Sequence, residues 1–273
     1  MHPEELVTDL SMRLELQTWP LQTPFHISGF TFKAIEVLVV TLEKAGHAGR
    51  GEAAGVYYRN DHPAFMIEQI QPLRSTIERG ISRASLQLLL PHGGARNALD
   101  CAVWDLEAKL GGRSAWQIAG LESPRPLLTT FTCGADDPEN MAAAATGYSG
   151  ARALKLKLTG EPIDAERVRA VRTARPDVWL GVDANQGLTR ASLERLMPVL
   201  IDAEVALVEQ PFPRGQEALL DGLKSPIPIA ADESVQCRQD IENLLAAQCH
   251  MGSKNLQVWS SFRSERGARL CGN

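Results

Sequence analysis

The second half of the chain alternates short apolar runs with longer segments of helical length and pattern. Residues 164–174 and 190–203 are two of the helical segments. The apolar runs are residues 127–133, 153–158, 178–183, 205–209 and 227–231. An order of strand, helix, strand, helix predicts a parallel sheet covered by helices. We therefore predict an α/β barrel with about five strands in this part of the chain.

The first part of the chain has a different pattern, in which strands follow one another without an intervening helix. Alternation, β-branched residues and a glycine-flanked turn mark residues 10–16, 35–42 and 46–51. Helical patterns follow at residues 63–79 and 95–110. We predict an α+β domain over residues 1–123 and the barrel domain over residues 124–273.

Three carboxylates stand at the ends of successive predicted strands: Asp183, Glu209 and Asp232. The carboxyl ends of barrel strands open on one face, so these side chains are expected to converge. Clustered carboxylates repel one another unless a cation lies among them, and Mg²⁺ prefers oxygen ligands. Each acid could instead cap the following helix. Three in register favour a metal site.

Lys155 and Lys157 lie two positions apart on one predicted strand, so they point to the same face. Leucines alternate with them and would pack outward, under the helices. Two ammonium groups held together beside a metal would have lowered pKa values, which suits a general base. The alternative is an exposed edge strand with ordinary solvated lysines.

Composition narrows the class of protein. A chain of 273 residues with 44% hydrophobic residues can bury a large core, and a net charge of −5 gives no reason to expect nucleic acid or an anionic membrane as partner. The five cysteines show no Cys-x-x-Cys spacing, which is typical of reduced thiols. The charged start and the lack of a long apolar stretch favour a cytoplasmic enzyme.

Four short motifs resemble those of the enolase superfamily, in particular its muconate-lactonizing subgroup with a Lys-x-Lys motif. They are Lys155-Leu-Lys157, Asp183-Ala-Asn185, Glu209-Gln-Pro-Phe212 and Asp232-Glu-Ser234, preceded by the run at 95–107. The resemblance covers roughly residues 8–247. Within the subgroup, residues 51–58 and 129–141 are most similar to dipeptide epimerases.

The resemblance implies a capping domain, a barrel, a Mg²⁺ cofactor and a small carboxylate substrate, a dipeptide or an N-acyl amino acid. Mg²⁺ would bind the substrate carboxylate while Lys157 takes or returns the α-proton. Lys155 would adjust the pKa of Lys157 and orient the substrate. Thr132 would form a hydrogen bond with the substrate. The implied reaction is epimerisation of a dipeptide of the L-Ala-L/D-Xaa type.

The resemblance also implies that two loops of the capping domain, residues 24–30 and 55–62, contact the substrate. Tyr57 and Arg59 in the second loop could hold its charged end. The alternative is ordinary surface, since aromatic and charged residues are common in turns.

The tail departs from the family pattern from about residue 248. A closed barrel needs eight strands and typically ~250 residues, and the expected sixth strand with its lysine is not evident. Lys254 is the candidate for that second acid–base residue. We expect a frameshift or premature stop in the gene, impaired activity, and open sheet edges that favour a homo-oligomer.

Other functions fit the same motifs. N-acylamino acid racemase, o-succinylbenzoate synthase and muconate cycloisomerase share the pattern from Lys155 to Asp232. A non-catalytic remnant that only binds metal is the alternative from a different class.

Overall fold

The computed structural model describes residues 10–27, 30–56, 59–251 and 256–258. The chain divides into two compact units, one of Met1–Pro24 with Phe32–Pro126 and the other of Phe25–Thr31 with Leu127–Asn273. No helix in the described part of the chain has both the length and the apolar character needed to cross a bilayer.

The first unit holds a three-stranded sheet in the order β1 (Ser11–Ile27), β2 (Phe30–Lys44) and β3 (His47–Ala53). Its helical segments follow in the chain: α1 (Pro63–Ile70), η2 (Gln71–Leu73), α2 (Arg74–Glu78), α3 (Arg83–Leu89), α4 (Gly94–Leu110) and α5 (Ala115–Ile118). The predicted strands and the helical patterns at 63–79 and 95–110 are thus confirmed, while α3 and α5 were not predicted.

Helix α4 packs directly on strand β3 through small residues. A Cβ added at Gly51 would lie 2.0 Å from the carbonyl oxygen of Ala98, and one at Gly49 would lie 2.4 Å from that of Ala102. Any side chain there would force the helix away from the strand. Leu38 and Leu99, both fully buried, belong to the apolar core beneath this contact.

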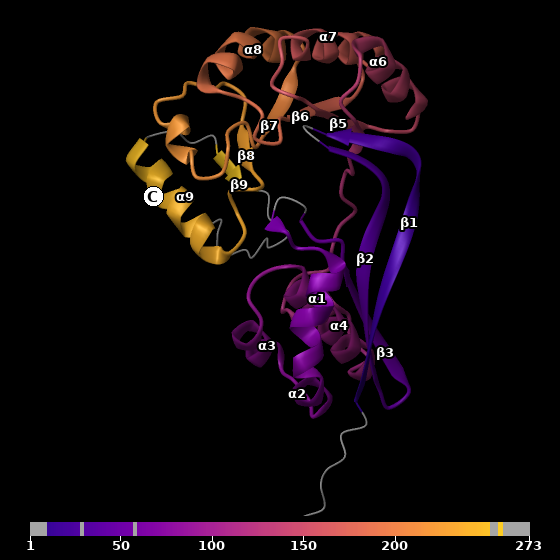
Figure 1. The fold of residues 1–273 in the computed structure, drawn as a ribbon. Helices are drawn as coiled ribbons and strands as arrows, with labels where there is room; N and C mark the ends of the chain where they lie inside the picture. The colour runs from indigo at the N-terminus through magenta and orange to yellow at the C-terminus, as the bar shows by residue number, and fades with distance from the viewer. Residues whose placement is uncertain (1–9, 28–29, 57–58, 252–255, 259–273) are drawn as a thin grey trace, which may run out of the picture. The chain divides into compact units, whose positions relative to one another are not determined.

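The second unit is built on a six-stranded sheet, and each neighbouring pair of its strands is parallel (Figure 1). The strands are β4 (Phe131–Cys133), β5 (Ala153–Lys157), β6 (Trp179–Asp183), β7 (Val205–Glu209), β8 (Ile229–Ala231) and β9 (Leu256–Val258). The helical segments are α6 (Pro138–Gly147), α7 (Asp164–Ala174), α8 (Arg190–Asp202), η3 (Glu217–Leu220) and α9 (Arg238–Met251). The five predicted strands and the α/β barrel class are confirmed, and β9 adds a short strand that was not predicted.

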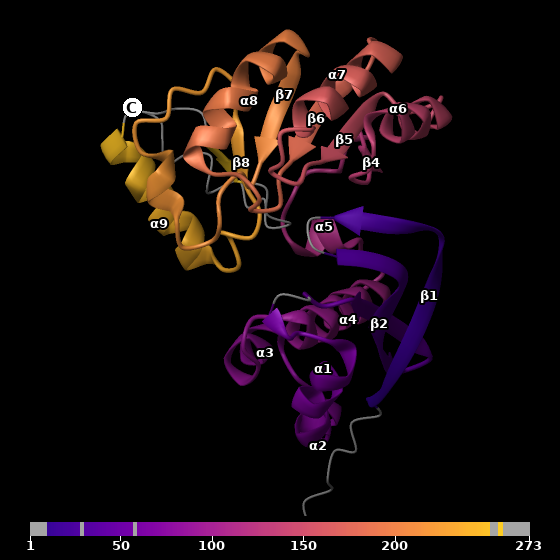
Figure 2. The same ribbon diagram turned by 45° about the horizontal axis from the view of Figure 1, so that its top comes forward.

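Helices α6, α7 and α8 cover one face of this sheet (Figure 2). Leu154, Leu156 and Leu158 are fully buried on that face and belong to one core with residues of all three helices, such as Val168 of α7. Burial of this apolar face is what holds the helices on the sheet. The expectation that the leucines pack under helices is confirmed, and Lys155 and Lys157 lie on the other face.

Candidate metal and acid–base site

Strand pairing brings the predicted site residues to one level of the sheet. Lys157 on β5 pairs with Asp183 on β6, and Asp183 pairs with Glu209 on β7. Because the strands are parallel and in register, side chains at paired positions point to the same face. The three residues therefore form a row across three adjacent strands.

The row is joined by short ion pairs. Nζ of Lys157 lies 2.6 Å from Oδ2 of Asp183. Nζ of Lys155, two positions earlier on β5, lies 2.9 Å from the same oxygen and 2.8 and 3.0 Å from the two carboxylate oxygens of Glu209. Asp183 is completely buried, and both lysines are mostly covered. The two lysines and two carboxylates thus form one compact charged cluster.

Burial and neighbouring charges displace the pKa values of this cluster in different directions. Burial opposes the charge of Lys155, but the carboxylates of Asp183 and Glu209 outweigh it and raise its pKa. The sequence predicts a lowered lysine pKa from two influences together, a second ammonium group and a bound metal. The two carboxylates that lie against Lys155 act in the opposite direction.

The two carboxylates of the row differ from each other. Burial would raise the pKa of Asp183, but Lys157 and Lys155 outweigh it and lower that pKa. Burial, together with the charge of Asp183, raises the pKa of Glu209 to about 7. A buried carboxylate beside an ionised one is harder to ionise, because the two negative charges repel each other.

Asp232, the third predicted carboxylate, follows the end of β8. Its side chain is exposed, and its backbone N–H donates to the side chain of Gln210 at 2.8 Å. Partial desolvation and the charge of Asp183 raise the pKa of Asp232, so Asp232 interacts electrostatically with the row. Within the described ranges, no three Asp, Glu, His or Cys side chains are already arranged to hold a metal ion.

Asn185 and Glu233, which belong to the predicted motifs but were not predicted as site residues, lie beside Asp183. The backbone N–H of Asn185 donates to Oδ1 of Asp183, and its side-chain amide donates to Glu233 at 3.3 Å. Glu233 is 4% exposed. Oδ1 of Asn185 and Oε2 of Glu233 are buried acceptors to which no group in the described part of the chain donates. Their place inside the motifs was the signal that could have identified them.

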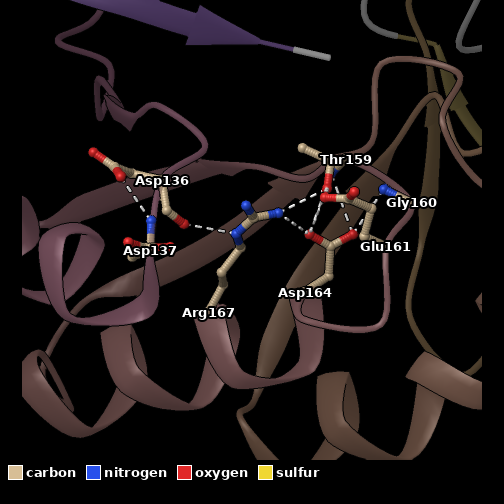
Figure 3. Close-up of polar contacts among 7 residues, drawn as sticks. All are labelled: Asp136, Asp137, Thr159, Gly160, Glu161, Asp164 and Arg167. Atoms are coloured by element: carbon tan, nitrogen blue, oxygen red, sulfur yellow. Dashed lines mark hydrogen bonds and ion pairs between the residues drawn. The ribbon is translucent and has the colours of Figure 1, made fainter. Parts of the chain in front are cut away.

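The loop after Lys157 is held by a buried network (Figure 3). Asp164, at the start of α7, accepts the backbone N–H of Gly160 at 2.8 Å and the guanidinium of Arg167 at 2.8 Å. Arg167 also donates to the hydroxyl of Thr159 and to the carbonyl of Asp136, at 2.7 Å each. The network ties the end of β5 to the loop between β4 and α6.

The loops after β5 and β6 touch each other through glycines. Gly160 has a φ of +83°, and a Cβ there would lie 2.0 Å from the carbonyl oxygen of Gly187. Gly187 itself has no room for a side chain, since its Cβ would lie 2.9 Å from the carbonyl oxygen of Ala184. The two main chains are therefore in direct contact just beyond the charged cluster.

The remaining predicted residues are less connected to the cluster. Thr132 on β4 pairs with Lys155 and is half-buried. Arg59 is exposed in the first unit. Tyr57 and Lys254 lie outside the described residues.

Two stretches of the chain match models of known protein families. Residues 10–120 match the N-terminal domain of the mandelate racemase and muconate lactonizing enzyme family, and residues 139–252 match the enolase C-terminal domain-like family. The L-Ala-D/L-Glu epimerase of Escherichia coli K12 is 38% identical over 230 residues, which are 84% of this chain and 71% of the relative.

Solved structures extend the likeness. An enolase family member from Agrobacterium tumefaciens with homology to dipeptide epimerases, bound to sodium and L-Ala-L-Glu, is 31% identical with a TM-score of 0.83; the match covers 91% of this chain and 74% of that one. The dipeptide epimerase of Cytophaga hutchinsonii, in complex with Mg and D-Ala-L-Val, is 25% identical with a TM-score of 0.79 over 88% of this chain and 69% of that one. The chain belongs to the enolase superfamily, in its mandelate racemase and muconate lactonizing enzyme group.

Proposed function

We propose that this site removes and returns the α-proton of a carboxylate substrate, and that the substrate is a dipeptide of the L-Ala-L/D-Xaa type. The observation that carries the proposal is the row of Lys157, Asp183 and Glu209 on three adjacent strands, which sets an amine next to a carboxylate cluster. The likeness to the epimerase of Escherichia coli supports the choice of a dipeptide.

The residues fit a divalent cation. Asp183, Glu209 and Asp232 supply the hard oxygen ligands that Mg²⁺ prefers. Burial and the charge of Asp183 raise the pKa values of Glu209 and Asp232, and a cation bound among the three carboxylates would offset both effects. The buried acceptors of Asn185 and Glu233 suit the water molecules that Mg²⁺ keeps. When bound, Mg²⁺ would hold the substrate carboxylate and stabilise the negative charge that develops as the proton leaves.

Lys157 is the acid–base residue in this proposal. Its ion pair with Asp183 fixes the direction of the amine, which a base needs in order to reach one face of the substrate. Lys155 is shared between Asp183 and Glu209, so it serves to hold positive charge near the substrate carboxylate. Thr132, its neighbour on β4, would hydrogen-bond the substrate.

Inversion also needs an acid on the opposite face of the substrate, and we assign that role to Lys254. Tyr57 and Arg59 are proposed to hold the charged end of the dipeptide. With Lys157 alone, a site would exchange the proton of one stereoisomer with solvent but would not convert it into the other.

The test is exchange of the α-proton, followed by proton NMR in deuterated water with Mg²⁺. L-Ala-L-Glu and other dipeptides would be compared with N-succinyl amino acids. We expect exchange and inversion of a dipeptide, exchange without inversion in a Lys254→Ala variant, and loss of Mg²⁺ binding in a Glu209→Gln variant. Exchange of N-succinyl amino acids alone would indicate a racemase of the alternative type. Mg²⁺ binding without any exchange would leave a site that only binds metal.

A further inference from the structure

Gln210 directly follows Glu209 and is 4% exposed, although its side chain is a polar amide. Its Oε1 accepts the backbone N–H groups of Asp232 at 2.8 Å and Ser234 at 3.1 Å. Its Nε2 donates to the carbonyl of Phe212 and to the hydroxyl of Ser234, at 2.8 Å each. The amide thus spans the gap between the end of β7 and the loop after β8.

These four bonds use the full capacity of the side chain, since an amide offers two lone pairs and two hydrogens. A buried group that is completely satisfied has a single favourable orientation, because every rotation leaves a partner unpaired. Gln210 is therefore a rigid part of the site, and a carboxylate of the same shape could not replace its two donor hydrogens.

The backbone of Gln210 adds two further connections. Its N–H donates to the carbonyl of Ala230 at 2.8 Å, and its carbonyl accepts the N–H of Gln186 at 2.8 Å. Gln186 lies in the loop that follows Asp183. One residue therefore joins the strand ends that carry all three candidate metal ligands.

Asp232 depends on this connection for its position. The pairing of β7 with β8 ends at Ala230, two residues before Asp232, and the Asp232 side chain is exposed. Ser234, on the other side of Glu233, is fixed both by Gln210 and by its own bond to Glu217 at 2.7 Å. The loop is thus attached to Gln210 through two backbone N–H groups, one of them that of Asp232 itself.

We propose that Gln210 positions Asp232 relative to Glu209 and so determines how well the site binds Mg²⁺. The inference rests on the proposed function, because it assumes that these carboxylates are the metal ligands. Mg²⁺ demands near-octahedral geometry with ligands at ~2.0–2.1 Å, whereas Ca²⁺ accepts longer and more variable arrangements. Loosening the loop should therefore weaken Mg²⁺ binding more than Ca²⁺ binding.

The experiment measures the Kd of Mg²⁺ and of Ca²⁺ by titration calorimetry, together with the free energy of unfolding in urea. The variants are Gln210→Ala, Gln210→Glu and the milder Ser234→Ala, which keeps the bond from Asp232 to Gln210. We expect the Gln210 variants to raise the Kd of Mg²⁺ about 10–100-fold, as loss of a partner that orients a metal ligand does, and to raise that of Ca²⁺ less. Ser234→Ala should change both in the same direction by a smaller factor.

Arg175→Lys is the matched control for lost stability. Arg175 is also buried and donates to the carbonyls of Ala145, Tyr148 and Ala151, at the amino ends of the strands. The Arg175→Lys substitution should lower the free energy of unfolding without changing the Kd of Mg²⁺ or of Ca²⁺.

Two results would overturn the inference. One is a Gln210 variant that folds and binds Mg²⁺ as the wild type does. The other is a Ser234→Ala variant whose Kd for Mg²⁺ is unchanged. This second result decides the question if the Gln210 variants do not fold. If the wild type itself binds no Mg²⁺, or if Glu209→Gln leaves its binding unchanged, the proposed function fails first.

Discussion

Lys157 and Asp183 lie side by side at the carboxyl ends of adjacent parallel strands, with the lysine Nζ 2.6 Å from the aspartate Oδ2. The same oxygen also accepts from Lys155 at 2.9 Å. In the proposed function Asp183 is a metal ligand as well, so a cation and two ammonium groups would share one carboxylate. Binding of the cation should therefore weaken both ion pairs and leave the Lys157 amine freer to exchange a proton.

Replacing Lys157 by alanine should lower the rate of α-proton exchange about 10²–10⁴-fold, because a positioned base contributes by that factor. The measurement is proton NMR in deuterated water at saturating Mg²⁺. Lys224→Ala, which removes an exposed lysine of the same unit, is the control and should exchange at the wild-type rate. Equal rates in the two variants would exclude Lys157 as the base.

Replacing Arg167 by methionine should lower the free energy of unfolding by about 3–5 kcal/mol, as breaking a buried ion pair does. Asp164 is 1% exposed and would be left buried without its guanidinium partner (Figure 3). Urea denaturation measures the change. Arg238→Met removes a pair whose arginine side chain is 90% exposed, so it should cost at most ~1 kcal/mol.

A double mutant tests whether that cost comes from the pair itself. Asp164→Asn combined with Arg167→Met should be less destabilised than the sum of the single variants, because neither charge is then left buried alone. Additive effects would mean that the two side chains stabilise the loop independently.

The ion pair of Asp177 with Arg175 should make stability depend on pH in acid. The hydrogen bond from Arg175 lowers the pKa of Asp177 to about 2, below its ordinary value of 3.8. The stabilisation is therefore complete above pH ~4 and is lost as the pH falls through 2. Asp177→Asn should be less stable than the wild type in urea at pH 7, and the difference should shrink as the pH falls toward 2. A difference that persists at pH 2 would contradict the assignment.

Cys133 should resist alkylation in the folded protein. Burial raises the pKa of its thiol to about 11, so little thiolate forms near neutral pH and the sulfur is also covered. Cys101 is exposed and provides the comparison. After iodoacetamide at pH 8, peptide mass spectrometry should find Cys101 modified and Cys133 intact, with both modified in urea.

The strands of the second unit could be predicted because Lys155 and Lys157 alternate with leucines that are all buried, a pattern that local sequence displays in full. Helix α3 was missed because its apolar residues do not form one face: Leu86 is buried, but Leu88 is 89% exposed. Strand β9 is held by pairing with β8, which adjacent residues do not reveal.

The positions of the charged residues of the site could be predicted from the sequence, but the directions of their pKa shifts could not. The direction of the Lys155 pKa depends on two carboxylates within 3 Å, and those distances follow from strand register. The bonds of Gln210 depend on the path of two loops. Sequence patterns indicate which strand ends meet, whereas the partners of each side chain there are set by tertiary structure.

The contact between Gly160 and Gly187 sets a limit on how the site can be adjusted. A contact between side chains can change when a side chain rotates to another rotamer. Peptide groups have no rotamers, so two main chains in contact act as a spacer that keeps a constant distance. Here the spacer separates the loop that leaves Lys157 from the loop that leaves Asp183. Substitutions elsewhere in the site can change its charge, but the width between these two loops is fixed by backbone alone.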